Sequence, residues 1–177
     1  MLRFTAPAFA LAALLSAAPA SAKIVEYRAE LNGQSATIST GSPAHANAMI
    51  SVDTTRKTVA VDLDVVGLSM DALWDNLVKA PIGPIHLHQY ANGDLADANS
   101  SELAFPLPFG PSYSTTPNGF RVRTGSRDYA GAVAPLPHSI SFDAFVAALE
   151  KGTVILNIHT DAFNGGEVNG LVKKADK

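Results

Sequence analysis

Apolar and polar residues alternate over several short stretches of this chain, which is the pattern of β-strands with one buried face. The pattern is clearest over residues 44–52 and 58–65, which the polar loop of residues 53–57 joins into an expected antiparallel hairpin. Residues 24–31 predict an earlier strand and residues 35–40 a shorter one. The side chains expected to face inward in the hairpin are Ala46, Ala48, Ile50, Val52, Val59, Val61, Leu63 and Val65.

A second hairpin is expected near the end of the chain. Residues 153–159 alternate between two faces, and Asn-Gly-Gly at 164–166 favours a turn because these residues tolerate positive φ. Residues 167–172 then return as a strand. The hairpin leaves a group of polar side chains near one end: His159, Thr160, Asp161 and Glu167.

Another short strand is predicted over residues 85–88, Ile-His-Leu-His. Its alternation sends the imidazoles of His86 and His88 to one face and the aliphatic side chains to the other. Pro81 and Pro84 favour extended backbone geometry just before it.

Two segments have helical spacing of apolar residues. Residues 69–79 follow Ser69, a common N-cap residue, and stop before Pro81; residues 141–152 run from Ser141 to Gly152. Several short strands with only two short helices predict a mainly β protein, an antiparallel β-sandwich of Greek-key or immunoglobulin-like type.

The segment between these elements, residues 90–134, has weaker patterns. Four prolines between residues 106 and 118 predict a surface stretch without regular structure. Three aromatic residues in this segment are expected to cover the core rather than line a groove: Phe105, Phe109 and Tyr113.

The composition of the N-terminal residues predicts where the protein is located. Residues 1–22 contain one basic residue, Arg3, then an apolar run too short to span a membrane, and the small residues Ala-Ser-Ala at 20–22. They predict a secretory signal cleaved near Ala22, which leaves residues 23–177 as one domain in the periplasm or the medium.

Charge and cysteine content exclude several classes of protein. The expected mature chain carries 12 basic and 16 acidic residues, and this weak acidity argues against nucleic-acid binding. The chain contains no Cys, so disulfides and thiolate–metal ligation are excluded. Any metal site must therefore use imidazoles or carboxylates.

The paired motifs resemble those of a known family. Ile-His-Leu-His at 85–88, a helix ending at Gly152, Leu-Asn-Ile-His-Thr at 156–160 and Gly-Gly-Glu-Val-Asn-Gly at 165–170 resemble the chordin-type (CHRD) domain. That family has Ala-His-Ile-His and later Val-Asn-Val-His-Thr with Gly-Gly-Glu-Ile-Arg-Gly, so Asn169 stands where the family usually has Arg. The resemblance spans about residues 30–172 and implies an exported β-sandwich without an established catalytic activity.

The segment that starts at His86 also looks like the His-Val-His strand that supplies copper ligands in copper/zinc superoxide dismutases. The usual disulfide cysteines and a zinc-ligand set are missing from this chain. The similarity is confined to this one strand.

These histidines are the candidate metal ligands. Side chains of His86 and His88 project from one face about 7 Å apart along the backbone, and His159 on the second strand is the natural third ligand. Three neutral imidazoles suit copper or zinc, with Asp161, Glu167 or water completing the shell. In the alternative interpretation, these histidines hydrogen-bond to one another and to Thr160 or Glu167 and stabilise the end of the sandwich.

Two functions follow from these alternatives. The first is an exported binding or interaction module whose histidine cluster is a candidate site for copper or zinc, with a protein or small molecule as its partner and with no catalytic residues. The second is a copper-dependent redox enzyme that uses the same three histidines, and a pocket lined by residues 105–113 would favour it. The remaining histidines, His45 and His138, are expected to be exposed in loops beside prolines.

Overall fold

The computed structural model describes residues 23–34 and 39–176. Its strands are β1 (Ile24–Asn32), β2 (His45–Asp53), β3 (Thr58–Val66), β4 (Ile85–Tyr90), β5 (Ser101–Leu107), β6 (Tyr113–Thr116), β7 (Gly119–Arg123), β8 (Arg127–Asp128), β9 (Val154–Ile158), β10 (Val168–Leu171) and β11 (Lys173–Lys174). The α-helices are α1 (Asp75–Val78), α2 (Tyr129–Val133) and α3 (Phe142–Lys151). Two 3₁₀ turns, η1 (Met70–Ala72) and η2 (Ala98–Ser100), complete the elements.

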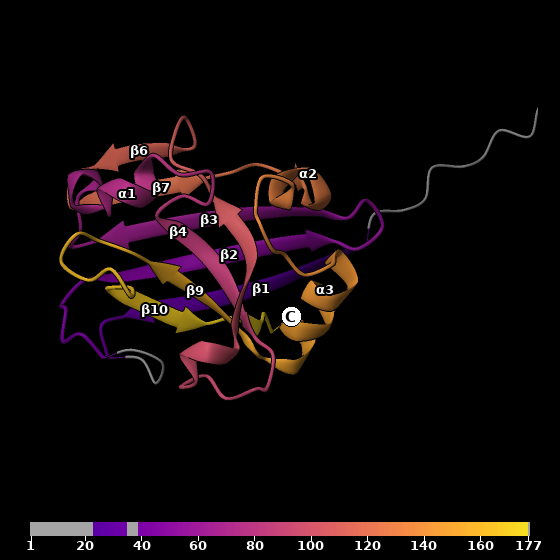
Figure 1. The fold of residues 1–177 in the computed structure, drawn as a ribbon. Helices are drawn as coiled ribbons and strands as arrows, with labels where there is room; N and C mark the ends of the chain where they lie inside the picture. The colour runs from indigo at the N-terminus through magenta and orange to yellow at the C-terminus, as the bar shows by residue number, and fades with distance from the viewer. Residues whose placement is uncertain (1–22, 35–38, 177) are drawn as a thin grey trace, which may run out of the picture.

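All strands belong to one antiparallel sheet that curls on itself. Its main path runs β5-β4-β9-β10-β1-β2-β3-β7-β6, with β11 beside β1 and β8 beside β3. The half containing β4 and β9 crosses in front of the half containing β2 and β3 (Figure 1). The two halves enclose the core as the layers of a sandwich do, so the predicted fold class is confirmed.

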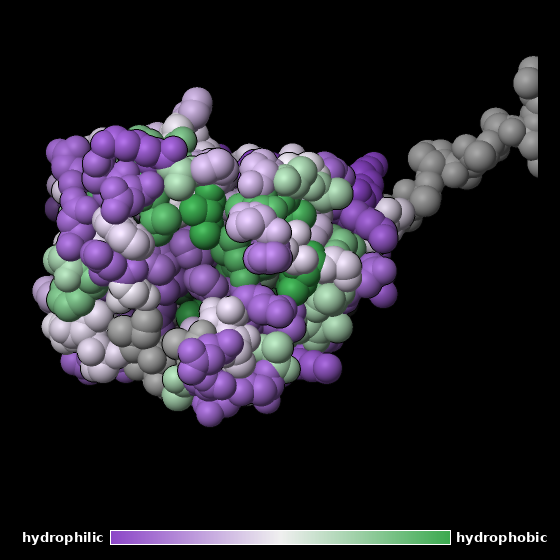
Figure 2. All heavy atoms as spheres, in the orientation of Figure 1, coloured by the Kyte–Doolittle hydropathy of each residue, from purple (hydrophilic) through white to green (hydrophobic). Residues whose placement is uncertain are grey.

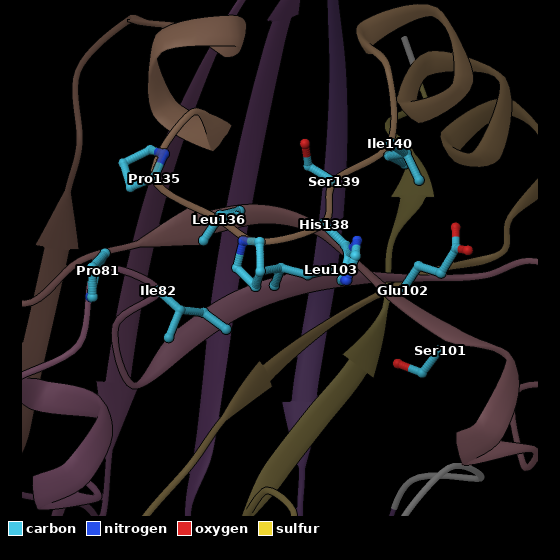
Figure 3. Close-up of a pocket in the computed structure, with 11 residues that line it drawn as sticks. Pro81, Ile82, Ser101, Glu102, Leu103, Pro135, Leu136, His138, Ser139 and Ile140 are labelled. Atoms are coloured by element: carbon cyan, nitrogen blue, oxygen red, sulfur yellow. The ribbon is translucent and has the colours of Figure 1, made fainter.

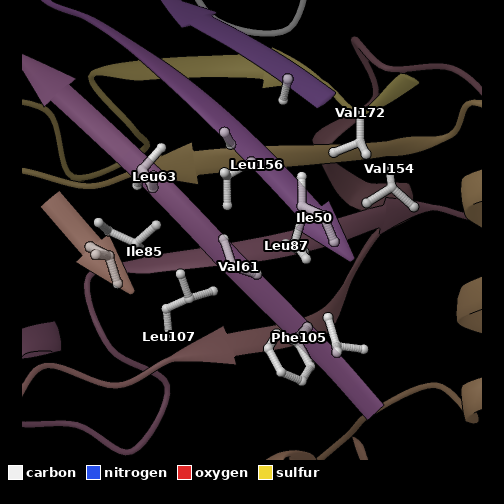
Figure 4. Close-up of a cluster of buried hydrophobic side chains, with 14 of the residues drawn as sticks. Ile50, Val61, Leu63, Ile85, Leu87, Phe105, Leu107, Val154, Leu156 and Val172 are labelled. Carbon is white, nitrogen blue, oxygen red and sulfur yellow. The ribbon is translucent and has the colours of Figure 1, made fainter. Parts of the chain in front are cut away.

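The core lies between these two halves. Ile50, Val61 and Leu63 from the central hairpin face Leu87 and Leu156 from the other half (Figure 4). Every side chain expected to face inward in that hairpin is buried. The pairing of Ala48 with Leu63 and of Ile50 with Val61 keeps the aliphatic positions on one face.

The last helix, α3, closes one end of this core as predicted. The Ser141 hydroxyl accepts a hydrogen bond from the Ala144 N–H, which caps the first turn. Gly152 ends the helix with φ of 70°, a left-handed conformation that glycine adopts without a steric penalty. Inside, the Phe145 ring stacks on the rings of Phe105 and Tyr129.

The helix predicted over residues 69–79 is wrong as a continuous element. The chain forms η1, then an extended break, then α1, and Ser69 makes no side-chain capping hydrogen bond. Within the break, Leu73 forms an isolated bridge with Thr160, and the Trp74 N–H donates to the His159 carbonyl at 3.1 Å. Backbone pairing with the end of β9 therefore overrides the local helical pattern.

The expectation of irregular structure between residues 106 and 118 is wrong in part. Strand β6 forms there and pairs with β7, and the buried Tyr113 hydroxyl donates to the Leu107 carbonyl at 2.6 Å. The short helix α2 was not predicted either. Phe105 and Tyr113 are buried, as expected for side chains that cover the core, whereas Phe109 is 38% exposed.

Two predictions fall mainly outside the described residues. The secretory signal, residues 1–22, lies there entirely, so it stays a prediction. Of the strand expected over residues 35–40, only Ser39 and Thr40 are described, and Ser39 forms an isolated bridge with Gln34. In the described part of the chain, no helix has the length and apolar character needed to cross a membrane.

The stacked aromatic core predicts a large loss of stability on truncation. Phe105→Ala should lower the free energy of unfolding by about 3–5 kcal/mol, because this residue of β5 is fully buried and its ring stacks on those of Tyr129 and Phe145. Urea denaturation of both proteins at the same pH measures the difference.

Phe109→Ala is the matched control, because this residue lies between β5 and β6 and its ring, 38% exposed, contacts the Tyr113 ring at a centroid distance of 4.9 Å. It should cost less than about 1.5 kcal/mol. Equal losses in the two variants would show that the core is not packed as described.

Candidate functional site

The curled sheet brings three imidazoles together. Strand β4 pairs with β9, with His86 opposite Asn157, and His159 follows directly after the last residue of β9. The His159 N–H continues the pairing by donating to the Pro84 carbonyl at 2.9 Å. One ring nitrogen from each of His86, His88 and His159 lies within 4.8 Å of the others.

Two of these rings are in direct contact. The Nε2 atoms of His86 and His159 are 3.0 Å apart, and the ring centroids are separated by 4.5 Å with an interplanar angle of 24°. The His88 ring meets the His86 ring edge-on at a centroid distance of 4.5 Å. A β-bulge between Leu87 and His88 in the β4–β5 ladder lies at this position.

The other ring nitrogen of each histidine has its own partner. His86 Nδ1 lies 3.2 Å from the Gly83 carbonyl oxygen, and His159 Nδ1 lies 2.7 Å from the Asn164 carbonyl oxygen. A carbonyl oxygen only accepts hydrogen bonds, so each Nδ1 must carry the proton. The neutral rings of both residues therefore present an unprotonated Nε2 with a lone pair.

These tautomers make the contact between His86 and His159 electrostatically unfavourable as it stands. Two unprotonated Nε2 atoms at 3.0 Å direct their lone pairs at each other, with no hydrogen between them. A proton on one ring or a cation bound by both would remove the repulsion. The same Nδ1 hydrogen bonds are those that commonly orient metal-ligating histidines.

Burial disfavours a second proton on each of the three imidazoles. It is the main cause that lowers the pKa of His86 well below its ordinary value, and the charges of His88 and His159 act in the same direction. Burial also lowers the pKa of His88 to about 4 and lowers the pKa of His159, although the Asn164 carbonyl opposes the latter shift. Neutral rings at pH 7 are the form that binds a metal.

The spacing of the rings fits a shared ion. With metal–nitrogen bonds of about 2.0–2.1 Å, two neighbouring ligands lie about 2.9–3.4 Å apart, which includes the observed separation between His86 and His159. Two ligands on opposite sides of an ion are about 4.2 Å apart at most, so a nitrogen pair at the 4.8 Å limit of the group would have to move closer by about 0.6 Å to share an ion. His88 is the only one of the three that is not fully buried, and its Nδ1 lies 3.0 Å from the Ser101 hydroxyl.

The carboxylate of Glu167 has a different environment. Its Oε1 accepts a hydrogen bond from the Ser42 hydroxyl at 2.6 Å, and its Oε2 accepts one from the Thr160 hydroxyl at 2.7 Å. The Thr40 hydroxyl also donates to the Glu167 carbonyl at 2.8 Å. This buried residue thus connects the hairpin after β9 to the segment before β2, and it lies outside the three-histidine group.

Asp161 is exposed and also lies outside the group. Its Oδ1 accepts a hydrogen bond from the Asp75 N–H at the start of α1, 3.1 Å away. The adjacent Trp74 ring lies 6.4 Å from the His159 ring, centroid to centroid. Asp161 and Trp74 therefore belong to the packing of residues 72–78 against the side of the cluster.

The Gly-Gly-Glu motif shapes the hairpin that carries the Asn164 carbonyl. Gly166 has φ of 118°, and a Cβ at this position would overlap the side-chain amide of Asn157. The Asn157 amide in turn donates to the Gly165 carbonyl at 3.1 Å. Glycine at 166 thus allows the hairpin to fold back closely enough for Asn164 to reach His159.

The two remaining histidines are exposed, as expected. His45 is the first residue of β2 rather than a loop residue, and His138 lies in the loop between α2 and α3. The sequence did not predict three hydrogen-bond partners of the site: Gly83 for His86, Ser101 for His88 and Ser42 for Glu167. A backbone carbonyl or a single serine produces no recognisable pattern in the sequence.

Comparison with known proteins identifies the family. A family model described as the CHRD domain matches residues 27–172, which is most of the chain and includes all three clustered histidines. Neither the curated proteins nor the solved structures gave a match. The family supports a binding or interaction module in general terms. The chain belongs to the CHRD domain family.

Proposed function

We propose that this CHRD domain, exported as its sequence predicts, binds one copper or zinc ion through His86, His88 and His159. The observation that carries the proposal is the 3.0 Å approach of two Nε2 atoms whose Nδ1 atoms both face carbonyl oxygens. A divalent ion between these lone pairs would replace a repulsive contact with two coordinate bonds.

The bound ion would support a binding module. It would cross-link β4 to the end of β9, two strands that carry core residues on their opposite face. Binding energy for the folded state adds directly to stability, so the metal would rigidify this half of the sheet. The burial of His86 and His159 favours an ion that is retained over one that exchanges freely.

A copper-dependent redox enzyme is the second candidate function. Three protein ligands leave a fourth position for water or substrate, and the partly exposed His88 marks the side from which a small molecule would approach. The groove described below is not lined by residues 105–113, the lining that would have favoured an enzyme. Copper-loaded protein that fails to accelerate superoxide dismutation would remove this candidate.

Replacement of single histidines tests the metal site. His86→Ala and His159→Ala should each lower the affinity for Zn(II) and Cu(II) by more than the roughly 10–100-fold typical of losing an outer hydrogen bond. Metal analysis of untagged protein and calorimetric titration measure stoichiometry and affinity. His45→Ala and His138→Ala, at exposed positions, should retain about one ion per chain.

Circular dichroism of each variant separates loss of the site from loss of the fold. Folded His86→Ala and His159→Ala proteins that keep a stoichiometric metal would contradict the proposal. So would a wild-type protein that binds no Zn(II) or Cu(II) after removal of bound ions and dialysis against either metal.

Glu167 should stabilise the fold without binding the metal. Glu167→Gln should keep the metal affinity within about threefold and lower the free energy of unfolding by about 1–3 kcal/mol, because either the half-buried Ser42 hydroxyl or the buried Thr160 hydroxyl loses a charged acceptor. Parallel metal titration and urea denaturation check this. A Glu167→Gln protein that unfolds like the wild type but loses the metal would instead make the carboxylate a ligand.

The metal-free protein should lose stability as the pH falls below about 6.5. The pKa values of the clustered histidines are lowered in the folded state, to about 4 for His88, so the unfolded chain binds more protons between pH 6.5 and 4. The free energy of unfolding should decrease through this window by up to about 1.4 kcal/mol per pH unit for each histidine that stays neutral. Urea denaturation in chelator at several pH values measures it.

His88→Gln provides the comparison for this pH series. It removes one of the groups with a lowered pKa, so its stability should depend less steeply on pH over the same window. An identical slope in the variant would show that His88 is not held neutral by burial.

A further inference from the structure

An open groove of about 1030 Å³ lies on the side of the molecule where β4 faces the viewer in Figure 1. The surface there is hollowed near its centre and exposes hydrophobic side chains between polar ones (Figure 2). Pro81 and Ile82 lie at one end, Ser101 and Glu102 at the other, and residues 135–140 run alongside (Figure 3). Its volume is at the upper end of the range for ligand pockets.

The groove runs along the edge of the sheet rather than over its face. Three consecutive residues of β5, Ser101 to Leu103, line it, although successive side chains of a strand point to opposite faces. A groove contacts all three only where it meets the edge of the strand. Strand β5 is the terminal strand of the main sheet path, and no strand among the described residues pairs with its outer edge.

The backbone along this part of the edge is available for pairing. The Ala91 N–H donates to the Ser100 carbonyl at 3.1 Å. Because the backbone groups of an antiparallel strand alternate in direction, the N–H and C=O of Glu102 then point toward β4, and those of Ser101 and Leu103 point away from the sheet. Farther along the same edge, the Tyr129 hydroxyl already donates to the Ala104 carbonyl at 2.9 Å. The outer edge of β5 is thus already hydrogen-bonded at Ala104, whereas its outward backbone groups at residues 101–103 are free to pair with an added strand.

The chemistry of the lining selects among possible ligands. Prolines, isoleucines and leucines form most of it, and the carboxylate of Glu102 is its one acidic group. None of the lining residues is Phe, Tyr or Trp, and the imidazole of the exposed His138 is the one aromatic ring among them. The groove therefore offers no large aromatic platform for a sugar or a base. An acidic group among aliphatic walls favours a ligand that is cationic and apolar.

We propose that this groove binds an extended peptide segment that carries a Lys or Arg side chain between apolar ones. The peptide would add a strand to the outer edge at Ser101 and Leu103, the mode known as β-augmentation. Its basic side chain would pair with Glu102, and its apolar side chains would pack on Leu103 and on the loop of residues 135–140. A short strand of about five residues, roughly 16 Å long, is sufficient for these contacts.

The peptide site borders the histidine cluster but does not depend on a metal. The Ser101 hydroxyl that lies at the end of the groove also contacts His88 Nδ1 at 3.0 Å. The three clustered histidines do not line the groove themselves. Peptide binding should therefore persist in the His86→Ala variant, which separates this proposal from the metal site.

A labelled five-residue peptide of alternating Val and Lys, with blocked ends, is the probe. Fluorescence anisotropy should detect its binding to the wild-type protein, and the matching Val and Glu peptide should bind at least tenfold more weakly. Amide chemical-shift changes on titration should concentrate at residues 101–103 and 135–140.

Charge reversal provides the matched pair of variants. Glu102→Lys should weaken binding of the Val–Lys peptide at least fivefold, whereas Glu26→Lys, the same change at an exposed position on β1, should alter it less than twofold. Equal effects of the two variants, equal binding of the acidic peptide, or chemical-shift changes away from the groove would overturn the proposal. Self-association through this edge without peptide binding would also overturn it, with a second copy as the occupant.

Discussion

The pairing of β4 with β9 is the interaction on which both the fold and the site depend. These strands are separated by more than 60 residues of sequence, yet their ladder sets Leu87 opposite Leu156 and His86 opposite Asn157. The leucines face the core, and because side chains alternate, the histidines are forced onto the opposite face. A slip of one residue in this register would bury imidazoles among aliphatic side chains, so the hydrophobic core itself fixes where the cluster forms.

The energetics of the cluster follow from its surroundings. Backbone carbonyls at Gly83 and Asn164 determine which nitrogen of each ring is protonated, and burial opposes a second proton. The hydroxyl groups around Glu167 satisfy that carboxylate separately, so it offers no countercharge to the imidazoles. The result is a set of neutral imidazoles whose unprotonated nitrogens are directed toward one another, in a region where an unpaired polar group is costly.

Much of this arrangement could be predicted from the sequence. Strict alternation marked the central hairpin and placed His86 and His88 on one face, and the position of His159 after its own aliphatic strand suggested the third ring. Contacts between segments that are distant in the sequence could not be predicted from such local patterns. Leu73 and Trp74 leave helical geometry because they pair with Thr160 and His159. Strand β6 forms in the proline-rich segment because it pairs with β7. Such contacts depend on segments that only the folded chain brings together.

The place of Trp74 beside His159 has an optical consequence. It is the single tryptophan of the chain, and its ring lies 6.4 Å from one of the clustered imidazoles. Its intrinsic emission therefore arises almost entirely next to the site. A paramagnetic ion held by those rings would quench that emission, whereas a closed-shell ion would leave most of it intact, so the protein carries its own spectroscopic sensor for the identity of whatever the histidines hold.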